Sequence, residues 1–179
     1  MKHPARAIAL AVGVVLVGFA VLLASQVNAS PQYKGGDLLG KPVPTFALPS
    51  LTGGPDVRSD NLRGRVVLVN FWNSWCIPCQ QEHAALTAFY DRHRNDGDLE
   101  MIGIVRDDTA AAARSWVHAH HDRWSFVTDP HGQASLDFGT TGQPESYMIS
   151  PNGVVVGVQR APVTVANLEE MLAVAKRAA

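Results

Sequence analysis

The chain has 179 residues, 46% of them hydrophobic and 17% charged, and its formal net charge at pH 7 is −1. This balance, without any Lys/Arg-rich run, gives no reason to expect a nucleic acid partner. Once an apolar N-terminal segment is set aside, about 150 residues remain, which suits one compact domain with a single core.

Positive charge stands directly before a long apolar segment at the N-terminus. Residues 1–6 contain Lys2, His3 and Arg6, and residues 7–24 carry no polar side chain. A run of this length is at the short end of a membrane span and is longer than most signal-peptide cores. Because the positive residues come first, we expect residues 1–6 in the cytoplasm and the chain after the span outside it. We favour a retained transmembrane anchor at 7–24 over a signal peptide cleaved after Ala29.

Residues 25–44 are punctuated by Pro and Gly, at positions 31, 35, 36, 40, 42 and 44. We expect a linker here that holds the following domain away from the membrane. The domain itself is expected over residues 45–179.

Apolar runs and helical patterns alternate along this domain. The expected elements are a short hairpin over 46–57, a strand at 65–71, a helix at 76–94, a strand at 99–105, a helix at 109–120, an edge strand at 125–128, a turn and short helix over 130–138, strands at 145–149 and 154–159, and a helix at 166–179. The strand at 65–71 is nearly all apolar, so it should be central and covered on both faces. Pro151-Asn152-Gly153 is a hairpin signal that requires antiparallel pairing of the last two strands. The order predicts an α/β fold with a mixed β-sheet between helical layers.

Both cysteines of the chain, Cys76 and Cys79, stand where the strand at 65–71 meets the following helix. A Cys-x-x-Cys at this junction puts the first sulfur at the helix N-terminus, where unpaired N–H groups and the macrodipole favour the thiolate. The second sulfur, one turn on, can resolve a mixed disulfide. The spacing predicts a reversible dithiol/disulfide couple that needs no metal and no organic cofactor.

Two structural roles compete with this interpretation. A stabilising disulfide is disfavoured because its effect grows with the length of the loop it closes, and this loop is very short. A zinc site would need four ligands, and the pair supplies only two. His118, His120 and His121 could complete such a site, but they stand in a polar, charge-rich stretch that indicates a solvated helix end.

Glu82 falls on the apolar side of the predicted helix. At 100° per residue, Cys79, Glu82, Leu86 and Phe89 lie within about an 80° arc. A carboxyl group there is desolvated, so its pKa should rise and it should exchange protons near the cysteines. The alternative is an ordinary surface Glu in an early helical turn. We expect Glu82 to take the proton of Cys79 when that thiol attacks the mixed disulfide.

The element order, with the cysteines at the start of the first helix, resembles the thioredoxin fold. Residues 71–83, 138–147 and 151–153 are similar to the TlpA/ResA/DsbE-like family of membrane-tethered thiol-disulfide oxidoreductases, and the resemblance covers about residues 45–159 and the anchor. It implies reduction of disulfides outside the cytoplasm, most often the haem-binding Cys-x-x-Cys-His of apocytochrome c. It also implies a polytopic membrane thiol-disulfide transporter as the electron donor. Ile77 departs from the family pattern, in which many members carry Glu or Pro there.

The resemblance further implies how substrate is held. A cis bond at Gln143–Pro144 would turn the backbone groups of Gln143 outward to pair with an extended substrate peptide. Glu145 corresponds to the acid that follows this proline in the DsbE-like branch, the alternative being a charge at a strand edge. Of Trp72 and Trp75, one is expected in the core and one as a lid over the first cysteine, with Trp75 as the candidate substrate contact.

Three other activities stay open. The protein could be a general reductant or oxidant of exported proteins. This activity differs from apocytochrome c reduction only in the partner surface and the reduction potential that it requires. It could be a tethered module that binds a soft metal such as copper, although residues 139–145 offer no His ligand before the last strands. Peroxide reduction is also possible for such a fold, but that chemistry prefers a lone cysteine in a Thr/Pro-rich loop, and Cys76 lies within a Cys-x-x-Cys.

Overall fold

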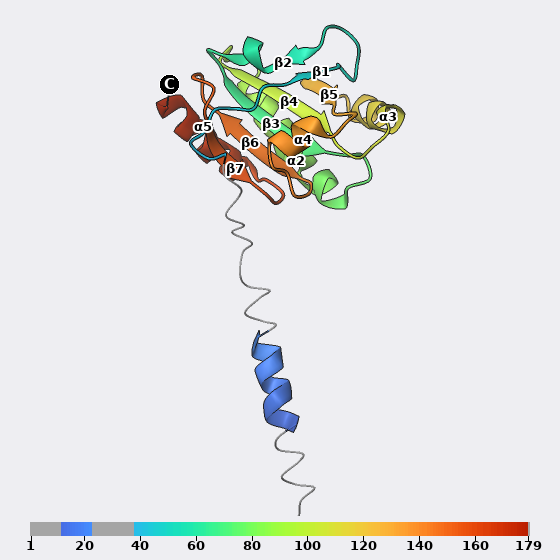
Figure 1. Ribbon diagram of the computed structural model, residues 1–179, viewed down its shortest axis with the longest axis vertical. Helices are drawn as coiled ribbons and strands as arrows, with labels where there is room; N and C mark the ends of the chain where they lie inside the picture. The colour runs from blue at the N-terminus through green and yellow to red at the C-terminus, as the bar shows by residue number, and fades with distance from the viewer. Residues whose placement is uncertain (1–11, 23–37, 179) are drawn as a thin grey trace, which may run out of the picture. The chain divides into compact units, whose positions relative to one another are not determined.

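The computed structural model describes residues 12–22 and 38–178. These residues fall in two units that divide between Tyr33 and Lys34. In the first unit, residues 12–22 are helical (Figure 1). Among the described residues, no helix is both long enough and apolar enough to cross a membrane. The expected cytoplasmic residues 1–6, the ends of the expected span at 7–24 and most of the linker at 25–44 lie outside the described residues.

The second unit contains a five-stranded mixed sheet in the order β5-β4-β3-β6-β7. The strands are β3 (Val66–Trp72), β4 (Leu99–Val105), β5 (Ser125–Thr128), β6 (Glu145–Ile149) and β7 (Val155–Gln159). β3 runs parallel to β4, which runs parallel to β5, whereas β6 is antiparallel to both β3 and β7. Every residue of β3 is buried, as expected for a central apolar strand. The antiparallel pairing across residues 151–153 is also confirmed.

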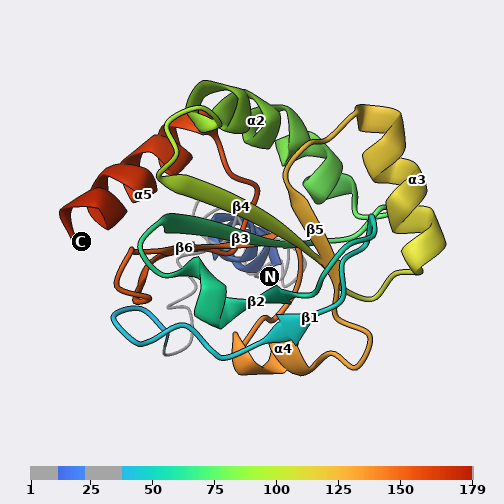
Figure 2. The ribbon, with the colours of Figure 1, turned by 90° about the horizontal axis from the view of Figure 1, so that it is seen from above.

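Helices cover one face of the sheet and shorter elements cover the other (Figure 2). The helices are α2 (Ile77–His93), α3 (Ala110–His120) and α5 (Val165–Arg177). The opposite face carries β1 (Ala47–Leu48), β2 (Val57–Arg58), the 3-10 helix η1 (Ser59–Leu62) and α4 (Gln133–Asp137). The second layer is therefore a hairpin and two short helices, not a layer of long helices.

Alternate residues of β3 divide the core between these two faces. Val67, Val69 and Phe71 pack with Phe138 and Leu48 on the hairpin side. Val66 and Leu68 pack with residues of α2 and α5. Trp72 packs with both cysteines and with α3. The period of two thus places the cysteines on the helical face of the sheet.

The start of the domain covers both edges of the sheet. Near one edge, the Val43 N–H donates to the Gly153 carbonyl and Lys41 accepts from the Val155 N–H, at 2.8 and 2.9 Å. At the other edge, the Leu51 N–H donates to the Phe126 carbonyl at 2.8 Å. Residues 38–44, which we expected to belong to the linker, are therefore part of the folded domain, because they satisfy backbone groups that an edge strand leaves unpaired.

Candidate functional site

The two cysteines are joined at the start of α2. The Cys76 and Cys79 sulfurs form a disulfide with a Cα–Cα distance of 5.2 Å. Cys76 is the N-cap residue, and its sulfur accepts the Cys79 backbone N–H at 3.1 Å. Pro78 occupies the first helical turn, where a missing N–H breaks no helical hydrogen bond. The first sulfur thus sits where a helix N-terminus stabilises a thiolate.

The loop between β4 and α3 holds the residues that precede Cys76. The Asp108 carboxylate accepts the Ser74 N–H at 2.8 Å, and the Trp75 indole N–H donates to the Asp107 carbonyl at 3.1 Å. Trp75 is nevertheless 61% exposed, whereas Trp72 is buried. The structure therefore assigns Trp72 to the core and leaves Trp75 at the surface beside Cys76.

The residues before β6 approach the cysteines from the other side. The Gln143–Pro144 bond is cis, as the resemblance implied, and the Gln143 carbonyl oxygen lies 3.7 Å from the Cys76 sulfur. Arg106 supports this loop by donating to Thr140 Oγ1 at 3.0 Å and to the Gly142 carbonyl at 3.4 Å. The backbone of Gln143 is thus adjacent to the reactive sulfur.

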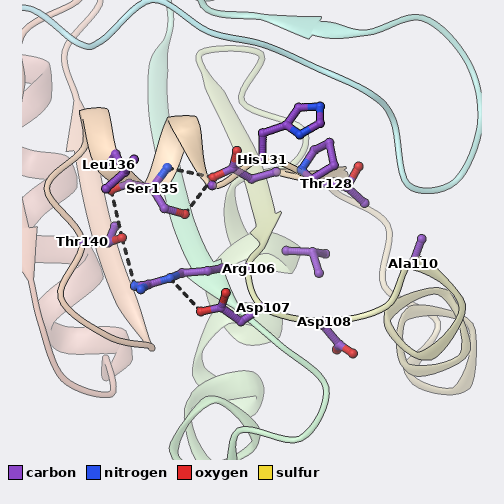
Figure 3. Close-up of a pocket in the computed structure, with 13 residues that line it drawn as sticks. Arg106, Asp107, Asp108, Ala110, Thr128, His131, Ser135, Leu136 and Thr140 are labelled. Atoms are coloured by element: carbon purple, nitrogen blue, oxygen red, sulfur yellow. Dashed lines mark hydrogen bonds and ion pairs between the residues drawn. The ribbon is translucent and has the colours of Figure 1, made fainter.

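A cavity of about 550 Å³ adjoins this loop (Figure 3). Arg106 points from its wall toward Thr140, and Asp107, Asp108, His131 and residues of α4 are among the others that line it.

Glu145 is buried and directed into the protein. Its carboxylate accepts the Thr141 and Gly142 N–H groups at 2.7 and 3.1 Å and forms an ion pair with Arg160 at 3.1 Å. The Tyr147 hydroxyl donates to the same carboxylate at 2.7 Å. Burial, together with this carboxylate, raises the pKa of Tyr147. The strand-edge alternative is wrong, because the carboxylate is buried and holds the loop that carries Pro144.

Glu82 is only 2% exposed. Its two oxygens accept hydrogen bonds from the Asn70 side chain and from the Val163 N–H, both at 2.8 Å. Burial raises the pKa of Glu82 from 4.5 to about 7, and the two hydrogen bonds oppose the shift only in part. The expected burial and raised pKa are confirmed, and the surface alternative is wrong. Cys79 and Glu82 lie one turn apart among the buried residues of α2.

Asn70, Asp108 and Arg160 are among the residues of the site that were not identified from the sequence. Asn70 bridges Glu82 and Ser146 through its amide nitrogen, and Asp108 and Arg160 support the two loops. Asn70 carried a usable signal, because it is the one side chain with hydrogen-bonding groups between Val66 and Phe71. Asp108 and Arg160 carried none, because charged residues in loops are ordinary.

The histidines expected as alternative metal ligands lie at the end of α3 and just after it. His118 and His120 are in its last turn, and His121 is its C-cap residue. In residues 12–22 and 38–178, no three His, Cys, Asp or Glu side chains come together in a way that could hold a metal ion.

The chain resembles known thiol-disulfide proteins over most of its length. A family model described as the AhpC/TSA family matches residues 39–158. The thiol:disulfide interchange protein DsbE of Pseudomonas fluorescens biotype C is 32% identical over 137 residues, which cover 76% of this chain and 74% of the relative. The thiol-disulfide oxidoreductase ResA of Bacillus cereus is 28% identical over 134 residues, which cover 75% and 76%.

Solved structures share the fold. A Chlorobium tepidum protein assigned as thiol:disulfide interchange protein DsbE superposes with a TM-score of 0.69 at 26% identity, covering 76% of this chain and 96% of that protein. A second C. tepidum thiol:disulfide interchange protein of the thioredoxin family superposes with a TM-score of 0.67 at 23% identity. The chain belongs to the AhpC/TSA family, and its fold and Cys-x-x-Cys pair make it a thioredoxin-like thiol-disulfide oxidoreductase of the DsbE and ResA type.

Proposed function

We propose that this protein reduces the haem-binding Cys-x-x-Cys-His disulfide of apocytochrome c outside the cytoplasm, as a step of cytochrome c maturation. The observation that carries the proposal is the position of the Cys76–Cys79 disulfide. The Gln143 carbonyl oxygen lies 3.7 Å from the Cys76 sulfur, and the buried Glu82 is on the same helix as Cys79. The relationship to DsbE and ResA proteins supports the same role.

In the proposed reaction, the Cys76 thiolate attacks one sulfur of the target disulfide. A mixed disulfide forms, and the other target sulfur leaves with the electron pair of the broken bond. Cys79 then attacks the Cys76 sulfur, and Glu82 accepts the proton from the Cys79 thiol. The target is released with two thiols, and Cys76–Cys79 is left oxidised. A membrane thiol-disulfide transporter would return the pair to the dithiol state.

The surface around Cys76 is suited to an extended peptide. Trp75 and Ile77 are 61% and 66% exposed on either side of the cysteine. We propose that they supply apolar contacts while the Gln143 backbone pairs with the substrate main chain. Pro144, through its cis bond, and Glu145, through its hydrogen bonds to Thr141 and Gly142, would hold the Gln143 backbone in place.

We also propose that residues 7–24 anchor the protein in the cell membrane, with residues 1–6 in the cytoplasm and the catalytic domain in the periplasm or at the outer face. The apolar segment and the positive residues before it support this orientation. In a membrane preparation, the full chain should stay in the pellet after alkaline carbonate treatment, and an alkaline phosphatase fused to its C-terminus should be active. Release by carbonate would contradict the anchor.

A trapping experiment tests the substrate. The full-length Cys79→Ala variant is expressed in its native host, thiols are quenched in acid, and the partners bound to Cys76 are identified by mass spectrometry. Without the resolving thiol, the mixed disulfide with apocytochrome c should persist. The Cys76→Ala/Cys79→Ala double variant is the control and should capture nothing.

Other results would redirect the assignment. A broad mixture of exported proteins would replace cytochrome maturation with general disulfide exchange. If the Cys79→Ala variant were exported correctly and still carried no adduct, the redox role itself would be contradicted. The metal content of the protein, purified under reducing conditions, would then test the metal-binding alternative.

A further inference from the structure

A second, smaller cavity lies beside Cys79, between α2, the end of β3 and the loop after α3. The space open to the centre of a water molecule is about 20 Å³. A single buried water needs about 10–15 Å³ measured in this way. Trp72, Asn73, Cys79, His83 and Asp122 are among the residues that line it. The cavity therefore has room for one water molecule next to the resolving cysteine.

Three buried polar atoms on residues that line this cavity have no hydrogen-bond partner among the described residues. They are Trp72 Nε1, Asn73 Oδ1 and Asp122 Oδ2. All three side chains are nine-tenths or more buried, with that of Asp122 only 1% exposed. Burying such atoms without a hydrogen-bond partner is unfavourable, because each gives up its hydrogen bond to water. They comprise one donor and two acceptors, which is the complement of a water that accepts one hydrogen bond and donates two.

The same cavity borders a His–Asp pair. His83 Nε2 and Asp122 Oδ1 are 2.8 Å apart. His83 lies four residues after Cys79 on α2, so the two side chains project from the same side of the helix. The His83 side chain is 19% exposed, so it can exchange protons with solvent, whereas Asp122 faces the interior.

We propose that this cavity binds one ordered water and that the water connects the Cys79 sulfur to the Asp122–His83 pair as a proton path separate from Glu82. The inference rests on the proposed thiol-disulfide exchange at Cys79. As the Cys79 sulfur bonds to Cys76, its S–H bond breaks and the proton passes to the water. The water gives one of its own protons to Asp122 Oδ2. The resulting carboxylic acid passes a proton to His83 across their 2.8 Å contact and returns to the carboxylate, and His83 releases a proton from its other ring nitrogen to solvent. The target sulfur leaves with its electron pair, so no further oxidant or reductant takes part.

A high-resolution crystal structure of the oxidised full chain tests the binding site. Electron density for a water should lie within hydrogen-bond distance of Trp72 Nε1, Asn73 Oδ1 and Asp122 Oδ2. A dry cavity, or side chains that turn to pair with one another, would overturn the proposal.

Stopped-flow kinetics test the proton path. The reduced protein is mixed with the disulfide of thionitrobenzoate, an aromatic disulfide, and the release of thionitrobenzoate is followed. The second release reports the attack of Cys79. Because the rates of two parallel paths add, removing one of two comparable paths in Asp122→Asn should slow it about twofold near neutral pH and should change its pH profile. Glu82→Gln should slow it independently, and the double variant should lose more than either.

The structure offers a matched control on the same helix. His93 Nδ1 and Asp96 Oδ2 form a second His–Asp pair, also at 2.8 Å, near the far end of α2. Asp96→Asn should leave both the rate and the pH profile of the second release unchanged.

The pH profile must be assigned among neighbouring groups. Those that face or adjoin the pair are Cys79 and Glu82 on α2, His120 on α3, whose ring is 4.8 Å from that of His83, and Arg123. Arg123 forms an ion pair with Asp91 at 3.0 Å. His120→Gln should keep the wild-type profile, because the hydrogen bond of His120 runs to the Trp116 carbonyl and not to Asp122 or His83.

The outcomes separate this inference from the proposed function. An Asp122→Asn variant with the wild-type rate and pH profile would overturn the proton path. A Cys79→Ala trap that captures no target would contradict the proposed function instead, because the aromatic disulfide tests exchange without a natural substrate.

Discussion

At the residue scale, the two buried glutamates near the cysteines differ in what surrounds them. Glu145 is paired with Arg160 and accepts hydrogen bonds from its own loop. Glu82 accepts only neutral donors in the part of the chain that the structure describes. Without a cation to offset desolvation, its pKa rises to about 7. Glu82 is thus suited to exchange protons, and Glu145 to hold structure.

This difference predicts how stability depends on pH. Folded Glu82 retains its proton up to about pH 7, whereas in the unfolded chain it loses the proton near pH 4.5. The folded state therefore binds more protons in this window, and the free energy of unfolding should fall as pH rises through it, by about 3 kcal/mol in all. Urea unfolding of the oxidised protein at pH 4.5 and pH 8 measures this change, which Glu82→Gln should remove.

The control for that measurement is Glu170→Gln, which alters an exposed carboxylate on α5. Its pH dependence should match the wild type. If Glu82→Gln kept the same slope, the fall in stability would have to come from another group. In the reduced protein, Glu82→Gln should also lower the pKa values of the cysteine thiols, since it removes a nearby negative charge.

Tyr147 links Glu145 to the core, which gives a second prediction. Tyr147→Phe removes the hydroxyl that donates to the buried carboxylate at 2.7 Å and should lower the free energy of unfolding by about 1–3 kcal/mol. Tyr90→Phe is the matched control, because that hydroxyl donates to the Arg123 carbonyl at an exposed position. Equal losses in the two variants would show that the Glu145 network adds no stability of its own.

At the scale of the element, β4 lies close against neighbouring side chains at Gly103. A Cβ atom there would lie 2.6 Å from the Phe126 ring and 2.9 Å from Trp72 Nε1. Both side chains are buried. The glycine is therefore needed for Trp72 to lie over the sheet beside Cys79.

Gly103→Ala should lower the free energy of unfolding by about 1–3 kcal/mol, because neither ring can move away without disturbing the core. Gly157→Ala in β7 is the control. Its Cβ would meet the Met171 methyl group at 2.9 Å, but a methionine can change rotamer, so the loss should be smaller. Denaturant unfolding of the two variants checks the order, and the reverse order would contradict this account of the packing.

The elements themselves followed closely from local patterns. The strand at 65–71 was expected from its apolar run and is found as Val66–Trp72. The helix expected at 109–120 is found as Ala110–His120, capped by Thr109, whose hydroxyl accepts the Ala112 N–H. The 3-10 helix Ser59–Leu62 was not expected, because its four residues carry no periodic apolar signal.

At the scale of the whole molecule, the segment 38–51 is decisive because it covers both edges of the sheet. A chain that begins at residue 38 should unfold at the same denaturant concentration as the full chain in detergent and should reduce a soluble disulfide equally fast. A chain that begins at residue 45 loses the main-chain hydrogen bonds of residues 40–43 to the β7 edge and should be less stable by roughly 2–4 kcal/mol. If the two truncated chains were equally stable, residues 38–44 would add nothing to the folded domain and would be a linker, as the sequence predicted.

Local sequence was enough to predict the redox pair, the burial of Glu82 and the order of strands and helices. Each of these depends on residues within one helix or one strand, where spacing alone sets which side chains share a face. The resemblance to a family added the cis bond before Pro144.

Contacts between distant segments could not be read in this way. The inward turn of Glu145 depends on Arg160, the Glu82 carboxylate is held by Asn70 and Val163, and Asp122 reaches His83 from another element. These partners are 12 to 81 residues apart in the chain. Nothing in the local pattern of a loop Asp or Arg marks its partner, because only the packing of helices on the sheet brings such groups together and removes them from water.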